Sequence, residues 1–169
     1  RGMSSVDLAT AAVAAALADT DASAAVRQAV DTNVGIRQFE ISGRGAPPLG
    51  CSTNYPRSVA SRVGAAPARA VLEPIGGQGP QHVLTEFAGA IAAGAADVVL
   101  VVGSENGSTL RYFANRDDKP DHSETIEGQL EDRGYGYEGL FDDYTVAHGL
   151  LGAPAQYGLL ENARRAKVG

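Results

Sequence analysis

The sequence has no tryptophan and only one cysteine, Cys51, among its 169 residues. A single thiol excludes an intramolecular disulfide and any zinc site built from several cysteines, and it favours a reducing compartment. No apolar run reaches the length of a membrane-spanning helix, and the first residues lack the apolar core of a signal peptide. We therefore expect a cytoplasmic protein that has no contact with a membrane.

Clusters of basic residues are also absent. The chain has 14 Lys and Arg against 20 Asp and Glu, a formal net charge of -6. Without a basic patch the protein has no electrostatic footprint for nucleic acid. The acidic pairs at 117–118 and 142–143 lack the spacing of a calcium-binding loop, so we predict no metal site.

The segment from Arg69 to Glu105 carries the clearest pattern of the chain. An apolar run leads to the turn Gly76-Gly77-Gln78-Gly79, a helical pattern continues to Gly94, and a second apolar run covers 97–103. This order predicts a βαβ unit with both strands buried. In open α/β sheets ligands bind at the carboxyl ends of the strands, so the glycine turn is the first candidate site.

The remaining elements predict a doubly wound α/β domain. A strand is expected over Thr32–Ile41, and Asn115–Tyr137 is charged and turn-rich, which predicts a long excursion outside the sheet. The pattern opens on a helix, so we expect its first strand upstream of Arg1. Helices are expected at about residues 5–18, 24–29, 54–63 and 155–166.

Two short patterns connect the chain with a known family. The segment from Arg69 to Ser108 resembles the nucleophile segment of the thiolases (acetyl-CoA acetyltransferases). Its last part matches the family pattern at Gly94–Val98 and Gly103–Ser108. The position of the nucleophilic cysteine of that family falls on Gly76. Asn54–Gly64 and His148–Ala163 are similar to a bacterial branch of thiolase-like proteins in which the turn is likewise Gly-Gly.

The resemblance implies a thiolase-like doubly wound mixed sheet with helices on both faces. Residues 1–105 would form an N-terminal half-domain without its first strand, and residues 106–169 a loop-domain-like excursion. The second half of the fold would come from further residues or from another chain. Because the family orders its strands three, two, one, four, five, a strand from outside the chain is expected between 32–41 and 97–103. The family also implies a homodimer that pairs through Arg69–Leu72 as an edge strand.

Gly76 stands where the resemblance implies the nucleophilic cysteine, and this limits the chemistry that can be expected. Glycine has no side chain to acylate, so the usual cysteine mechanism is not expected. The turn offers its amides to a thioester carbonyl oxygen, or it serves only the close packing of helix and strand. His82, on the first turns of the following helix, is a candidate catalytic residue. The candidate oxyanion turn consists of Gly76, Gly77, Gln78 and Gly79.

The ligand implied by the resemblance is a coenzyme A thioester, and no covalently bound cofactor is expected. Three arginines are candidates for its phosphates, while Cys51 is interpreted as an inert thiol. Two functions remain open. The protein binds or acts on acyl-CoA thioesters, or it is a non-catalytic subunit that binds CoA esters or serves as a structural partner. A generic nucleotide-binding domain with a phosphate on the turn is the third alternative. The three arginines are Arg111, Arg164 and Arg165.

Overall fold

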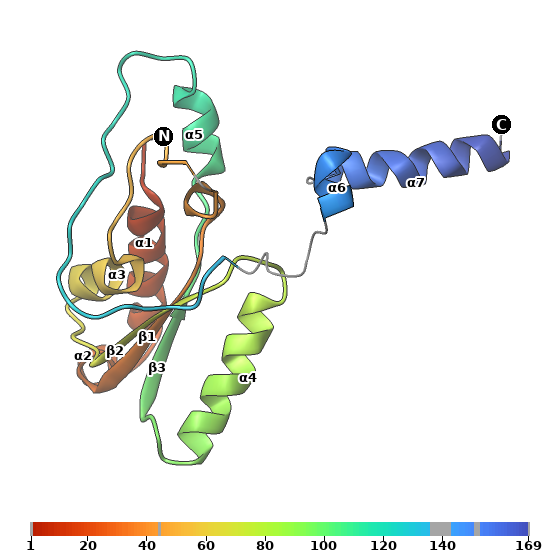
Figure 1. Cartoon of the computed structure of the whole chain (residues 1–169). Helices are drawn as coiled ribbons and strands as arrows, with labels where there is room; N and C mark the ends of the chain where they lie inside the picture. Colours follow the sequence, from red (N-terminus) through yellow and green to blue (C-terminus); the bar gives the residue numbers. More distant parts are fainter. Residues whose placement is uncertain (1, 44, 136–142, 151–152, 169) are drawn as a thin grey trace. The chain divides into compact units, whose positions relative to one another are not determined.

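The computed structural model describes residues 2–43, 45–135, 143–150 and 153–168. The chain divides into two compact units, Arg1–Tyr135 and Gly136–Gly169. The second unit contains the helices α6 (Asp143–Ala147) and α7 (Ala153–Val168), as Figure 1 shows. None of the described helices combines the length and the apolar character that crossing a lipid bilayer requires.

A four-stranded sheet is the centre of the first unit (Figure 1). All of its strand pairs are parallel, whereas a mixed sheet was expected. Parallel neighbours need a crossover connection, and helices make the crossovers from one long strand to the next. Across the sheet the strands are β3 (Val98–Val102), β1 (Val30–Ile36), β2 (Arg69–Glu73) and β4 (Glu131–Asp132).

Helices cover both faces of this sheet, which confirms the expected layers. α1 (Ser5–Ala18) and α3 (Tyr55–Val63) pack on one face, and α4 (Gly79–Ala92) packs on the other (Figure 1). The short α2 (Ser23–Ala29) leads from α1 into the first strand. The two apolar clusters that fix the layers include Val6, Val13, Val59, Leu72 and Val102 on the first face and Val34, Val71, Val83 and Phe87 on the second.

Local capping signals explain where the first helices begin. The Ser4 side chain accepts a hydrogen bond from the amide of Asp7, and the Asp7 side chain accepts one from the amide of Ser4, a complete capping box. α3 begins in the same way after Asn54, whose side chain accepts from the amide of Arg57. The predicted span of α1 is confirmed, and α3 begins within one residue of its predicted start.

The expectation of a foreign strand between β1 and β3 is wrong. β1 pairs directly with β3, with Asn33 opposite Leu100 and Val34 opposite Val101. The interruption of this ladder is a register shift between Val30 and Thr32. The backbone groups that were expected to lack partners satisfy each other, so no inserted strand is needed in this sheet.

The edges of the sheet also differ from the expectation. β2 is not an edge strand, because Val71 and Leu72 pair with Glu131 and Asp132 of β4. The segment expected as an excursion outside the sheet therefore supplies one of its strands. β3 and β4 lie at the two edges of the described sheet, and most residues of β3 are only half-buried.

Three short helical segments were missed by the sequence interpretation, and one of them is α6. β1 ends at Ile36, and the remainder of the expected strand forms the 3-10 helix η1 (Phe39–Ile41). The last sheet-like hydrogen bond of this segment runs from the amide of Arg37 to the Glu73 carbonyl, at 2.9 Å. After β3 the helix α5 (Gly107–Phe113) follows Asn106, a residue type typical of helix starts, although the Asn106 side chain makes no capping bond.

Tyr55, the first residue of α3, packs closely against Gly35 of β1. A Cβ atom at Gly35 would lie 2.6 Å from a ring carbon of Tyr55, which is itself buried. The Tyr55 hydroxyl is held in place, 2.9 Å from the Ser104 hydroxyl. Glycine at this position therefore allows the start of α3 to lie directly on β1.

We expect Gly35→Ala to destabilise the protein by about 1–3 kcal/mol, because the added methyl group forces the Tyr55 ring out of its position. Urea unfolding followed by circular dichroism measures the change. Gly89→Ala is the matched control, since a Cβ atom there meets no atom within 4 Å and alanine favours the helix. Equal stability of the Gly35→Ala variant and the unsubstituted protein would contradict the packing argument.

Candidate functional site

The glycine turn joins the carboxyl end of β2 to the start of α4, as predicted. Gly76 has φ +143°, a backbone conformation that residues with side chains rarely adopt. A Cβ atom at Gly76 would also lie 2.5 Å from the side-chain oxygen of Gln78. The chain therefore favours glycine at the position where the resembling family carries its nucleophile.

The amides of the turn are only partly used by the protein itself. The amide of Gly79 donates to the Gly76 carbonyl at 3.1 Å. The amides of Gly77 and Gln78, both exposed residues, have no acceptor among the residues that the structure describes. The turn thus has two amide donors available for a ligand oxygen at the start of a helix.

His82 lies one turn into α4 and is paired with a buried carboxylate. Its Nδ1 lies 2.5 Å from Oε1 of Glu73, the last residue of β2. The Glu73 side chain is only 6% exposed, while the His82 side chain is 56% exposed. With Nδ1–H as the donor to Glu73, Nε2 makes no hydrogen bond of its own among the described residues and lies 3.9 Å from Oε2 of Glu86. Sequence reasoning missed Glu73, although it is the acidic residue at the end of an apolar strand.

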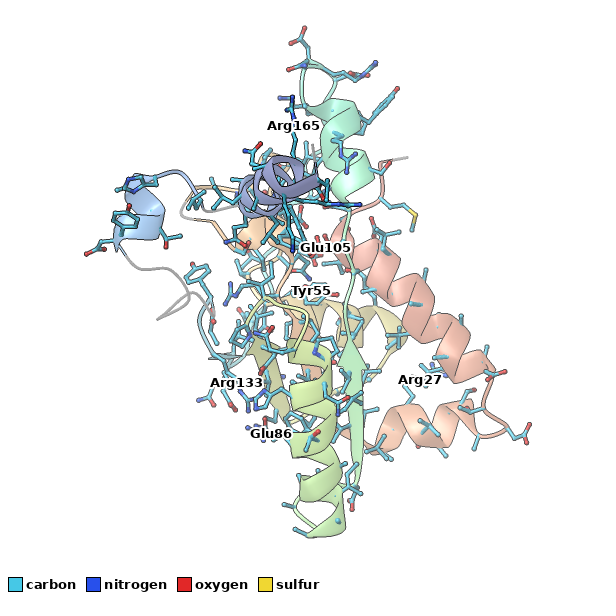
Figure 2. All side chains as sticks on the ribbon, turned by 90° about the vertical axis from the view of Figure 1, so that its right-hand side faces the viewer. Arg27, Tyr55, Glu86, Glu105, Arg133 and Arg165 are labelled. Atoms are coloured by element: carbon cyan, nitrogen blue, oxygen red, sulfur yellow. The ribbon has the colours of Figure 1, made fainter. Side chains whose placement is uncertain are left out.

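Arg133 joins Glu73 to α4. Its guanidinium lies 3.0 Å from the second oxygen of Glu73 and donates to both carboxylate oxygens of Glu86, at 2.6 and 2.8 Å. Figure 2 shows Glu86 on α4 and Arg133 beside it. The hydrogen bonds from Arg133 lower the pKa of the Glu86 carboxyl below its ordinary value, and Glu86 in turn raises the pKa of Arg133. The buried Glu73 carboxylate is thus held in place by a hydrogen-bonded cation on one side and by His82 on the other.

The residues of the second family-like pattern make structural contacts. The Ser104 hydroxyl donates to the Ser5 carbonyl at 2.7 Å, and the Glu105 carboxylate accepts from the amide of Phe39 at 3.0 Å. Burial, and then the neighbouring charge of Glu40, raise the pKa of Glu105 against the effect of the Phe39 amide. Asn106 is fully buried, and neither atom of its side-chain amide has a partner among the described residues.

The three candidate arginines are all exposed. Arg111 is exposed on α5, while Arg164 and Arg165 lie exposed on α7 of the separately described second unit. The interpretation of Cys51 as an inert thiol agrees with its surroundings, because burial and then the charge of Glu40 raise its pKa. The structure thus brings together the glycine turn, His82 and Glu73, while the roles of the three arginines stay predictions.

The comparisons with known proteins can be set beside this geometry. No family model and no curated protein matches the chain. Among solved structures, the chain is similar to one described as a monomeric SCP2-thiolase like protein type 1 from Mycobacterium smegmatis. The two are 48% identical, and the superposition has a TM-score of 0.65 over 100% of this chain.

This likeness shows that the fold is thiolase-like. The chain spans 27% of the length of that protein, so the activity of a whole thiolase-like protein is not transferred to it. That protein is described as monomeric, so the expected homodimer gains no support from it and stays a prediction. The division into a half-domain and a loop domain after Glu105 also stays a prediction.

We expect Gly76→Cys to lower the stability by about 1–2 kcal/mol, because the new side chain must adopt a disfavoured positive φ. Gly77→Cys is the matched control, since its Cβ atom would meet no atom within 4 Å. Thermal unfolding monitored for both variants measures the difference. A Gly76→Cys variant that is as stable as the Gly77→Cys variant would show that the turn does not require glycine.

We expect Arg133→Met to lower the free energy of unfolding at pH 7 by about 1–3 kcal/mol, since it leaves Glu73 and Glu86 without their shared donor. The pKa of Glu86 is lowered in the folded protein, so its contribution to stability exists above its ordinary value of 4.5 and disappears as the pH falls through the folded value. Stability of the variant should therefore fall less between pH 6 and pH 3.

Arg116→Met is the control for this measurement, because Arg116 pairs with Asp118 on the surface. The free energy of unfolding is measured with urea across the pH range for all three proteins. The control should follow the unsubstituted protein throughout. An Arg133→Met profile parallel to that of the unsubstituted protein would contradict the role assigned to Arg133.

Proposed function

We propose that this chain is the half-domain of a thiolase-like protein that binds acyl-CoA thioesters at the Gly76–Gly79 turn without a cysteine acyl-enzyme. The observation that carries the proposal is the pair of free amides at Gly77 and Gln78, placed after a glycine in the nucleophile's position. Amides at a helix start hold the carbonyl oxygen of a thioester, where negative charge develops when the carbonyl is attacked. The thiolase-like neighbour supports the thioester as the ligand class.

His82 gives this site a group that can move a proton. Glu73 occupies Nδ1, so Nε2 is the nitrogen that a ligand or a water molecule meets. With such a pair beside an activated carbonyl, the site can act by direct transfer or cleavage of the bound thioester. No covalent intermediate forms on the turn, because Gly76 has no side chain to accept the acyl group.

A non-catalytic structural partner is the second candidate function. The observation that favours it is the edge strand β3, which is half-buried and has β1 as its one neighbour in the described sheet. The outer side of an edge strand offers its backbone N–H and C=O groups to a further strand, so a partner segment would pair with β3. In this function the thiolase-like fold positions an active partner and turns over nothing itself.

One assay separates the two functions. The protein is incubated with acetyl-CoA and with acetoacetyl-CoA, and free coenzyme A, condensation products and cleavage products are measured. Release of coenzyme A above the uncatalysed rate supports the enzyme function. Binding of acetyl-CoA by calorimetry without turnover supports a CoA-ester-binding partner, and absence of both rejects the thioester proposal.

Substitution of Gln78 tests the amide donors directly. Gln78 has φ −80°, close to the value that proline requires, so Gln78→Pro removes the N–H of this residue with little change in the backbone. We expect the variant to bind acetyl-CoA roughly 3- to 10-fold more weakly, the cost of about one neutral hydrogen bond.

Gln78→Ala is the matched control for the proline variant. The Gln78 side chain makes no capping bond to α4, and alanine keeps the amide, so affinity should be unchanged. Calorimetric titration with acetyl-CoA measures both variants. Equal affinity of the proline and alanine variants would show that the Gln78 amide does not contact the ligand.

A further inference from the structure

A hollow of about 340 Å³ lies at the carboxyl end of β1, on the face of the sheet that α3 covers. Apolar side chains line much of it, among them Ile41, Leu72 and Leu130, together with the rings of Tyr55 and Tyr135. Its volume falls at the lower end of the range for small-molecule sites. The hollow is separate from the glycine turn, because the turn leads into α4 on the opposite face.

The polar part of the hollow is the ion pair of Arg37 and Asp132. The Arg37 side chain is 4% exposed, and it donates to the Asp132 carboxylate, to the Gly134 carbonyl at 3.0 Å and to the Ile41 carbonyl at 3.3 Å. Its guanidinium also lies over the ring of Tyr135, 4.6 Å from the centroid. These contacts fix the position of Arg37 from three directions.

Within the described part of the chain, each member of the pair has hydrogen-bonding capacity left: Arg37 has unused N–H groups, and Asp132 has an unused carboxylate oxygen. A guanidinium has five N–H groups, and three of those on Arg37 are used in the bonds just named. Oδ1 of Asp132 accepts from Arg37 and, at 2.8 Å, from the amide of Gly134. Oδ2 has no hydrogen-bond partner among the described residues. Arg37 and Asp132 both line the hollow, and the Asp132 side chain, 48% exposed, is the more accessible member of the pair.

We propose that this hollow binds a small uncharged ligand that has an apolar body and an amide end. The carbonyl oxygen of an amide accepts from Arg37, and its N–H donates to Asp132, so one amide satisfies both members of the pair. A carboxylate would compete with Asp132 for Arg37, and an amine would compete with Arg37 for Asp132. The proposal goes beyond thioester binding at the turn and does not depend on it.

Cys51 makes occupancy of this hollow measurable. It lines the hollow, it is half-buried, and it is the only cysteine of the sequence. A small uncharged thiol reagent such as methyl methanethiosulfonate therefore labels one site, and intact mass reports the rate. A ligand in the hollow covers Cys51 and slows the labelling, by about tenfold at ten times its Kd.

The test compares three ligands of the same chain length. Hexanamide, hexanoate and hexylamine are added to the intact protein at about pH 8.5, each up to ~50 mM, which covers the millimolar affinities expected of fragments. We expect hexanamide to slow the labelling of Cys51 severalfold and the two charged ligands to have little effect. No effect of hexanamide, or an equal effect of hexanoate, overturns the proposal. A further arm uses acetyl-CoA as the ligand. Slower labelling with acetyl-CoA indicates that the amides of its pantetheine occupy the hollow, and unchanged labelling indicates that the amide belongs to a separate ligand.

Two substitutions make the assignment specific. Asp132→Asn removes the charge that balances Arg37, so hexanoate should then slow the labelling more than hexanamide does. Ala46→Phe, on the exposed rim of the hollow, should abolish slowing by either ligand, while Ala12→Phe on the exposed face of α1 should change nothing. Unchanged ligand preference in the Asp132→Asn variant would overturn the role of the pair.

Discussion

The buried carboxylate of Glu73 is the point on which the carboxyl edge of the sheet depends. Its side chain pairs with His82 on α4 and with Arg133 next to β4, while its carbonyl accepts from Arg37 at the end of β1. A carboxylate that is 6% exposed is costly unless such partners surround it. Three segments far apart in the sequence are therefore held at the place where the glycine turn begins.

At the carboxyl ends of the strands, the two faces of the sheet carry different groups. On the α4 face, the Glu73–His82 pair lies beside the turn that begins at Gly76. On the α3 face, Arg37 and Asp132 form the polar wall of a separate hollow. The residues of β4 and Arg133 contribute to both faces, so the segment around Glu131 sets the geometry of each.

Local signals allowed some of this structure to be predicted, and long-range contacts account for the rest. The Ser4–Asp7 capping box and the glycine turn are readable from residues within one helical turn. β4 is only two charged residues long, and Arg69, which pairs with Glu131 at 2.7 Å, lies 62 positions away. The direct pairing of β1 with β3 was missed because the strand order of whole thiolases was applied to this set of strands. The Glu73–Arg133 contact could not be predicted either, since 60 positions separate the two residues.

The central claim is that the turn holds an acyl thioester without forming a bond to the acyl group. The most direct measurement is intact mass under denaturing conditions after incubation with acetyl-CoA, paired with equilibrium dialysis of the native protein. The account predicts that acetyl-CoA is retained in dialysis while the mass of the protein stays unchanged. A protein mass increased by one acetyl group, removed by hydroxylamine as thioesters are, would contradict the account and return Cys51 as the acyl acceptor.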